Sequence, residues 1–86
     1  MESFGLFPNP AQETVHVALD SYQNKNIEIQ LINQFGQRLN IDKISNNQQQ
    51  YHTVNLSKLN NGIYTIWIFV EGNRPVGKRL IVNRLY

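Results

Sequence analysis

Several kinds of residue are missing or scarce in this 86-residue chain, and each absence excludes a class of protein. There is no cysteine, so a disulfide framework, a cysteine-ligated zinc site and a thiol nucleophile are excluded. No apolar run approaches the roughly 18 residues that a membrane-spanning helix requires. Met1-Glu2-Ser3 opens without the basic and apolar stretches of a signal peptide, so we expect none in this segment.

Charge is also scarce. Charged residues make up 16% of the chain and the net charge is +2, which is too little for a nucleic-acid-binding module. The basic residues are unevenly placed, because half of the eight follow the last acid, Glu71: Arg74, Lys78, Arg79 and Arg84. Two interpretations stay open. Positive charge protects an exposed edge strand from pairing with another chain, and a basic C-terminal segment can be bound by a partner.

The residue types that carry catalysis or bind metals form no recognisable set. His16 and His52 fall on different predicted strands, and Ser45 and Ser57 lack the strand–turn–helix setting of a serine nucleophile. There is no glycine-rich phosphate loop. The six carboxylates are scattered and share no site; they are Glu2, Glu13, Asp20, Glu28, Asp42 and Glu71. We therefore expect no enzymatic activity, no metal and no cofactor.

The chain does contain a clear alternation of apolar and polar residues with a period of two, which is typical of half-buried strands. Seven strands are predicted, at about residues 4–7, 13–19, 26–33, 37–41, 51–56, 63–70 and 76–83. With 41% hydrophobic residues, the chain is expected to form one domain over residues 1–86. Seven short strands with turns about every ten residues favour an all-β, immunoglobulin-like antiparallel β-sandwich, with a barrel as the alternative.

Two polar segments interrupt the strands. In Pro8-Asn9-Pro10, each proline fixes its own φ and removes a backbone donor, which makes a stiff kink. The kink either carries a first strand from one sheet to the other or is an ordinary connecting turn. The amide-rich run from Ser45 to Gln50 is expected to be a loop with nothing in the core.

Individual residues next to the turns have expected roles. Gly62 is expected at positive φ, and Gly36 either at positive φ or where another backbone approaches closely. Phe35 is expected to plug the core. Tyr64 is predicted to face inward and to bond its hydroxyl to a backbone group. Trp67 and Phe69 then face outward, where either a neighbouring loop covers them or they form an interface, including one between two copies of the chain.

Four segments in this order resemble a known family. They are LFPNPA at residues 6–11, FGQRL at 35–39, LSKLNNGIY at 56–64 and KRLIV at 78–82. Together they are similar to the type A C-terminal sorting domain of the Bacteroidetes type IX secretion system, over nearly the whole chain. The sequence departs from the family pattern in the Leu85-Tyr86 extension after Arg84 and in the tryptophan at position 67.

The resemblance implies an immunoglobulin-like sandwich that serves as an address label at the end of a secreted cargo protein. It implies recognition by an outer-membrane shuttle and translocon, removal by a sortase-like protease at or upstream of Phe4, and attachment of the cargo to cell-surface lipopolysaccharide. Secretion or surface display by way of the periplasm would follow. The recognition residues that it implies are Pro8, Asn9, Pro10, Gly36, Gly62, Tyr64, Lys78, Arg79, Leu80, Val82 and Arg84.

A physical mechanism can be predicted for this recognition. The last strand lies at or near a sheet edge, so a receptor pairs with its backbone and attracts its cationic end. Two rival functions stay open: a carbohydrate-binding module that stacks sugars on Trp67, Phe69 and Tyr51, and a structural spacer of a secreted protein.

Overall fold

The computed structural model describes residues 4–84, so the Leu85-Tyr86 extension lies outside the described residues. It contains a short 3-10 helix at Asp20–Tyr22 and seven strands. The strands are β1 (Leu6–Phe7), β2 (Thr14–Ala18), β3 (Ile27–Asn33), β4 (Arg38–Ile44), β5 (Tyr51–Asn55), β6 (Gly62–Val70) and β7 (Val76–Val82). All seven predicted strands are present. β4 extends three residues beyond its predicted end at residue 41.

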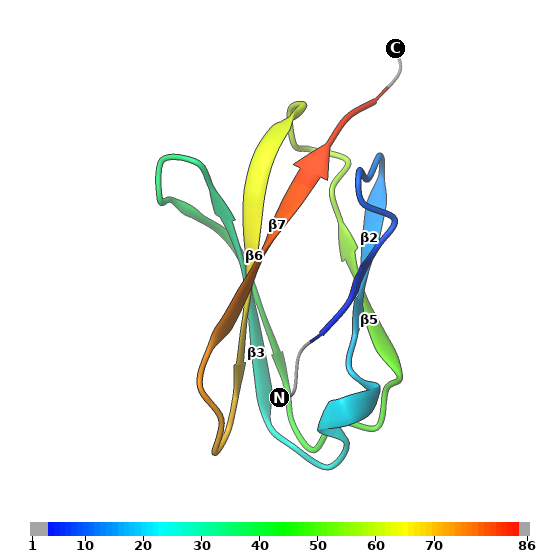
Figure 1. Cartoon of the computed structure of the whole chain (residues 1–86), viewed down its shortest axis with the longest axis vertical. Helices are drawn as coiled ribbons and strands as arrows, with labels where there is room; N and C mark the ends of the chain where they lie inside the picture. The colour runs from blue at the N-terminus through cyan, green and yellow to red at the C-terminus, as the bar shows by residue number, and fades with distance from the viewer. Residues whose placement is uncertain (1–3, 85–86) are drawn as a thin grey trace.

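The strands form two antiparallel sheets, ordered β1-β2-β5 and β4-β3-β6-β7, and the sheets lie face to face as two layers (Figure 1). The predicted β-sandwich is therefore confirmed, and the barrel alternative is wrong. The first, second and fifth strands share one sheet, and the third, sixth and seventh share the other, as in immunoglobulin-like domains. Within the described residues, no helix is long and apolar enough to cross a membrane.

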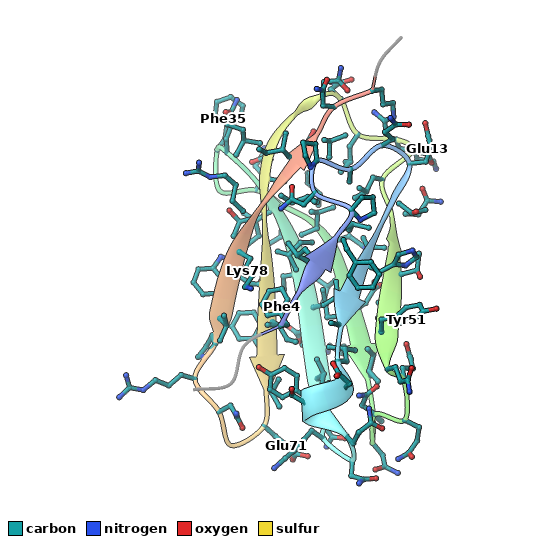
Figure 2. The ribbon with its side chains drawn as sticks, turned by 45° about the vertical axis from the view of Figure 1, so that its right-hand side comes forward. Phe4, Glu13, Phe35, Tyr51, Glu71 and Lys78 are labelled. Atoms are coloured by element: carbon teal, nitrogen blue, oxygen red, sulfur yellow. The ribbon has the colours of Figure 1, made fainter. Side chains whose placement is uncertain are left out.

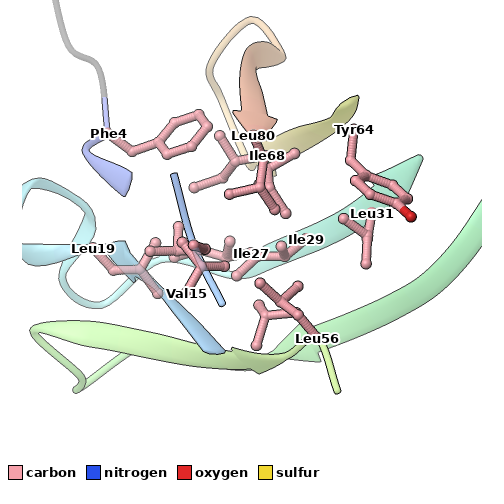
Figure 3. Packing of buried hydrophobic residues seen from close by; sticks show 14 of the residues in the cluster. Phe4, Val15, Leu19, Ile27, Ile29, Leu31, Leu56, Tyr64, Ile68 and Leu80 are labelled. Carbon is pink, nitrogen blue, oxygen red and sulfur yellow. The ribbon is translucent and has the colours of Figure 1, made fainter. Parts of the chain in front are cut away.

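Alternation along the strands builds the core. In β6, buried residues alternate with exposed or half-buried ones over the whole strand, because successive side chains point to opposite faces of a sheet. Buried side chains from both sheets fill the space between them (Figures 2 and 3). Those fully enclosed include Val15, Val17, Leu19, Val54, Leu56, Ile66, Ile68, Leu80 and Val82. Burial of each side chain of this size contributes about 1.5–3 kcal/mol.

The proline kink carries the chain between the sheets. Before it, Leu6 and Phe7 pair antiparallel with β2. After it, Ala11 forms a parallel bridge with Val82 of β7, in the other sheet. Both proline peptide bonds, after Phe7 and after Asn9, are cis. The crossing interpretation is right and the ordinary-turn interpretation is wrong.

Two expectations about the turns need correction. Phe35 is 80% exposed rather than buried, because it sits at the tip of the β3–β4 turn, beyond the reach of the core. Gly36 has the expected positive φ of 84°, but Gly62 does not have a positive φ. Gly62 is the first residue of β6, and the segment before it passes from one sheet to the other instead of closing a hairpin.

The amide-rich loop does place one residue in the interior. Asn47 is 0% exposed, and its Nδ2 donates to the carbonyl oxygens of Leu19 at 3.3 Å, Tyr22 at 3.3 Å and Gln49 at 3.1 Å. Its Oδ1 accepts from the Gln49 backbone N–H at 3.0 Å. A buried amide is tolerated when its donors and acceptor are satisfied, so the prediction that nothing in this loop enters the core is wrong.

Candidate recognition surface

Three of the four sequence segments meet at one end of the sandwich, where the chain also leaves β7. This end, called the Phe35 end below, consists of the β3–β4 turn (33–37), the β5–β6 connection (56–61) and the residues after β7 (83–84). Strand pairing brings them together, because Asn33 pairs with Tyr64 and Gly62 pairs with Val82. They lie together at the top of Figure 1.

Asn33 organises the β3–β4 turn. Its Oδ1 accepts backbone N–H bonds from Phe35 at 2.9 Å and Gln37 at 3.0 Å. Its backbone carbonyl accepts from Gly36 at 3.0 Å, and the positive φ of Gly36 suits a residue without a Cβ. The turn is thus held by hydrogen bonds while the Phe35 ring projects away from the body of the domain (Figure 2).

An open depression of about 370 Å³ lies between this turn and the β5–β6 connection. Its apolar lining comes from Phe35, Leu39, Leu59, Ile63 and Tyr64. One exposed cation, Lys58, lines it, and the exposed Arg38 directly precedes the lining residue Leu39 in the chain. The neighbouring carboxylates are engaged: Glu13 with Arg84, and Asp42 with His52, whose Nε2 lies 3.1 Å from Asp42 Oδ2. The Phe35 end therefore presents an exposed apolar ring and an apolar depression, with positive charge at the border.

Tyr64 supports this end from below. Its ring is buried, and its hydroxyl donates to the Asn60 carbonyl at 2.6 Å. This confirms the predicted role. It is also the tyrosine corner of immunoglobulin-like sandwiches, in which a tyrosine near the start of the sixth strand bonds back to the chain a few residues upstream.

Arg84 clamps the end of the chain onto the domain. Its side chain is only 10% exposed. The guanidinium donates to the carbonyl oxygens of Leu56 and Leu59, and Nε lies 3.1 Å from Glu13 Oε1. The expectation of an available cation at the C-terminal end is therefore wrong for Arg84, because its charge is used to close the β5–β6 connection.

The other basic residues of β7 are presented differently. Lys78 is half-buried and lies over the Phe4 ring, with Nζ 5.5 Å from the ring centroid (Figure 2). Arg79 is exposed. Leu80 and Val82 point to the opposite face of the strand and are in the core. Of the cations expected to form the docking handle of this strand, Arg79 is the one that faces solvent.

β7 is an edge strand, as predicted, but half of its free edge is covered. Asn9 Nδ2 donates to the Arg79 carbonyl and Asn9 Oδ1 accepts from the Ile81 N–H, each at 3.0 Å. Ala11 then donates to the Ile81 carbonyl at 2.7 Å and accepts from the Asn83 N–H at 2.9 Å. A receptor strand could pair with this half of β7 only after displacing residues 8–11.

The outward aromatic residues form two separate groups. Trp67 and Phe69 are half-buried on the outer face of the four-stranded sheet, with ring centroids 6.4 Å apart. Trp67 packs on Gly77 of β7, where a Cβ would lie 2.9 Å from the indole. Its cover is thus a neighbouring strand and not a loop. Tyr51 clusters with Phe7 and His16 on the three-stranded sheet, so a sugar platform shared by Trp67, Phe69 and Tyr51 is wrong.

The titratable residues do not assemble into a metal site. His16 lies in the aromatic cluster on one sheet, and its Nδ1 is 2.8 Å from Thr53 Oγ1. His52 lies on β5 and contacts Asp42 on β4. In the part of the chain that the structure describes, no three histidine, aspartate or glutamate side chains are grouped as metal ligands.

Comparison with known proteins agrees with this architecture. No curated protein matches the chain. The family model described as "Secretion system C-terminal sorting domain" matches residues 5–83, a span that contains all seven strands and all four sequence segments. The chain therefore belongs to this family of type IX sorting domains, which are export signals attached to a cargo and not enzymes.

Proposed function

We propose that this domain brings an N-terminal cargo to the type IX outer-membrane shuttle and translocon. A sortase-like protease then separates domain and cargo, and the cargo is secreted or attached to lipopolysaccharide on the cell surface. The single observation that carries the proposal is the family match over residues 5–83. The domain itself performs no chemistry in this scheme, because the bond is cut by the protease.

The docking surface in this proposal is the Phe35 end. Exposing a phenylalanine ring at 80% is unfavourable in water, and covering it by a partner gains about 1.5–3 kcal/mol. The hydrogen-bonded turn keeps the ring in place before binding, which reduces the entropy lost on association. These are the properties of an anchor residue for a partner pocket.

Charge completes the surface. Lys58 lines the apolar depression, Arg38 precedes the lining residue Leu39 in the chain, and the carboxylates Glu13 and Asp42 are engaged within the domain. A receptor whose apolar pocket is bordered by acidic side chains would attract this end and orient it. Arg79, exposed on β7, adds a cation on the adjoining face.

The remaining family residues shape the surface without contacting the receptor. Asn9 joins β7 to the crossing segment, and Tyr64 and Arg84 hold the β5–β6 connection. Gly36 permits the turn that carries Phe35. In this proposal Pro8, Pro10, Gly62, Leu80 and Val82 act in the same way, through backbone conformation or core packing.

The proposed cleavage site is at or upstream of Phe4. The Phe4 ring is 2% exposed and belongs to the core cluster, so a cut after Phe4 would remove a core residue from the domain. Proteases cut exposed and unpaired chain segments more readily than buried ones.

The test is export of a reporter in a Bacteroidetes host with a type IX system. A fluorescent protein with a signal peptide is fused ahead of residues 1–86, and surface and periplasmic fractions are compared in the parent strain and a translocon deletion. Surface delivery that requires the translocon is expected. Retention of the unmodified fusion in the periplasm of the parent strain would refute the sorting function.

The docking surface is tested in the same assay. Phe35→Ala should reduce surface delivery at least about tenfold, since the lost burial weakens receptor binding by that factor. Tyr51→Ala, which removes another exposed ring from the opposite sheet, should leave delivery unchanged. Unimpaired export of Phe35→Ala would reject this surface while leaving the sorting function intact.

A carbohydrate-binding role remains the second candidate, and one feature favours it. Phe7, Ala18, Asp20, Gln50 and Tyr51 line a shallow depression of about 290 Å³, so exposed rings lie beside a carboxylate and an amide. Glycan-array binding that is lost in Tyr51→Ala would support it. Self-association through Trp67 and Phe69 also stays a prediction.

A further inference from the structure

β4 is an edge strand that no other segment of the described chain covers. It ends the four-stranded sheet opposite β7, and every residue from Arg38 to Ile44 is exposed or half-buried. Among the described residues, no backbone hydrogen bond from outside its sheet reaches β4. Leu39 and Ile41 are 42% and 43% exposed. A long apolar edge with unpaired backbone groups is a template for another strand.

Two of the other three sheet edges differ from β4. β1 has only two residues, and half of the edge of β7 is covered by Asn9 and Ala11. The remaining edge strand, β5, is two residues shorter than β4. Short edge strands and covering segments are common ways of preventing edge-to-edge pairing. β4 has one lysine, Lys43, and a bulge near its start, where Leu39 is the extra residue relative to β3. Residues 40–44 keep regular pairing with β3.

The order of residues in β4 is self-complementary. We propose that β4 pairs antiparallel with β4 of a second copy of this chain, about a two-fold axis at Asn40. Asn40 then faces Asn40 of the second copy, and Leu39 of each copy faces Ile41 of the other. Arg38 of each copy comes to the same end of the ribbon as Asp42 of the other, so no two like charges are brought together there.

The faces of β4 agree with this register. Asn40 and Asp42 pair with Leu31 and Ile29, which are buried, so these two polar side chains point to the inner side of the sheet. Ile41 pairs with Gln30 and points outward. The Asn40 amides therefore meet on the inner side, and Ile41 lies on the outer side, next to the bulged Leu39 of the other copy.

Neighbouring registers are less favourable. A two-fold axis at Ile41 would place Lys43 opposite Leu39 and would remove both Leu39–Ile41 pairs. With the axis at Leu39, Ile41 would face Gln37. The Asn40 register keeps the apolar pairs and places no two like charges opposite each other. Because a two-fold contact uses the same surface on both copies, it closes as a dimer and does not extend into a fibre.

The absence of cysteine makes the register directly testable. Directly opposite residues on paired strands have Cβ atoms roughly 4.5–5.5 Å apart, close enough for a disulfide after small adjustment. Asn40→Cys should therefore form a covalent dimer under mild oxidation. Lys43→Cys is the matched control on the same strand, since its two copies would lie roughly 20 Å apart. Equal cross-linking of the two variants would overturn the proposed register.

Sedimentation equilibrium of the unmodified chain supplies the second measurement. Association should depend on concentration and stop at a dimer. The double variant Leu39→Lys/Ile41→Lys should raise the dissociation constant at least about tenfold, because like charges then face each other across the axis. Ile81→Lys, on the outer face of β7 at the opposite edge of the sheet, should leave it unchanged. A chain that stays monomeric at millimolar concentration would overturn the proposal, independently of any export result.

Discussion

The Asn9 side chain is hydrogen-bonded to Ile81, 72 residues later in the chain, much as neighbouring strands are hydrogen-bonded to each other. The Ile81 N–H donates to Asn9 Oδ1 at 3.0 Å. The same amide donates to the Arg79 carbonyl at 3.0 Å. The side chain thus takes the place of a peptide group on the edge of β7. The flanking Pro8 and Pro10 have no N–H of their own to contribute, so a carboxamide between them supplies the pairing.

Replacing this amide should loosen the crossing segment. Asn9→Ala removes both hydrogen bonds and should lower the free energy of unfolding by about 1–2 kcal/mol, measured by urea denaturation. Asn9→Asp is the matched control, because a carboxylate still accepts from Ile81 but cannot donate to Arg79. It should retain part of the stability. Equal stability of Asn9→Ala and the unmodified chain would contradict the role assigned to the amide.

Arg84 should contribute more through its carbonyl contacts than through its ion pair. Glu13 is 51% exposed at its side chain, and ion pairs open to solvent contribute about 0–1 kcal/mol. The contacts with Leu56 and Leu59 are part-buried, and hydrogen bonds to charged groups contribute about 1.5–3 kcal/mol each.

We therefore expect Arg84→Ala to lower the free energy of unfolding by about 3 kcal/mol and Glu13→Gln by less than about 1 kcal/mol. Arg79→Ala, which removes an exposed arginine from the adjacent strand, is the control and should be nearly neutral. Chemical denaturation of the three variants measures the difference. A larger loss for Glu13→Gln than for Arg84→Ala would reverse this assignment.

Asn47 should be the most sensitive residue of the amide-rich loop. Asn47→Ala removes the amide hydrogen bonds to three carbonyl oxygens and to the Gln49 N–H at a fully buried position. The Leu19 carbonyl keeps the Tyr22 N–H, and the Gln49 carbonyl keeps Gln23 Nε2. The free energy of unfolding should fall by about 2–4 kcal/mol. Gln48→Ala, one residue later and exposed, should cost less than about 0.5 kcal/mol. Similar thermal midpoints for the two variants would show that the Asn47 network is dispensable.

Gly77 should control the position of the indole of Trp67. A Cβ at residue 77 would lie 2.9 Å from Trp67 Cε2, so Gly77→Ala must displace the ring toward solvent. Trp67 is the sole tryptophan, and its fluorescence should shift to longer wavelength in the variant. Gly5→Ala, where the added Cβ would lie at an ordinary 3.8 Å from Ala18 Cβ, serves as the optical control. An unchanged emission maximum in Gly77→Ala would contradict the packing of these two residues.

Much of the architecture follows from local sequence. Alternation such as that of Val15, Val17 and Leu19 depends only on the two-residue period of a strand, so it is visible without knowing the neighbours. The same holds for Tyr64, whose inward position follows from its parity with Ile66 and Ile68. The positive φ of Gly36 reflects a local steric preference. These predictions were correct because each depends on residues close together in the chain.

The sites that give the surface its character depend on contacts between distant residues. Asn47 can be buried because carbonyl oxygens of Leu19 and Tyr22 accept from its amide. The Arg84 guanidinium is withdrawn from solvent because it donates to carbonyl oxygens 25 and 28 residues earlier in the chain. Phe35 has the apolar side chain of a typical core residue, and it is exposed to water only because it lies at the tip of a turn. Residue type and spacing therefore determined the strands and the two-layer core. Which polar groups are consumed inside the domain, and which side chains remain for a partner, was decided by the tertiary structure, because a hydrogen bond forms only where folding brings donor and acceptor together.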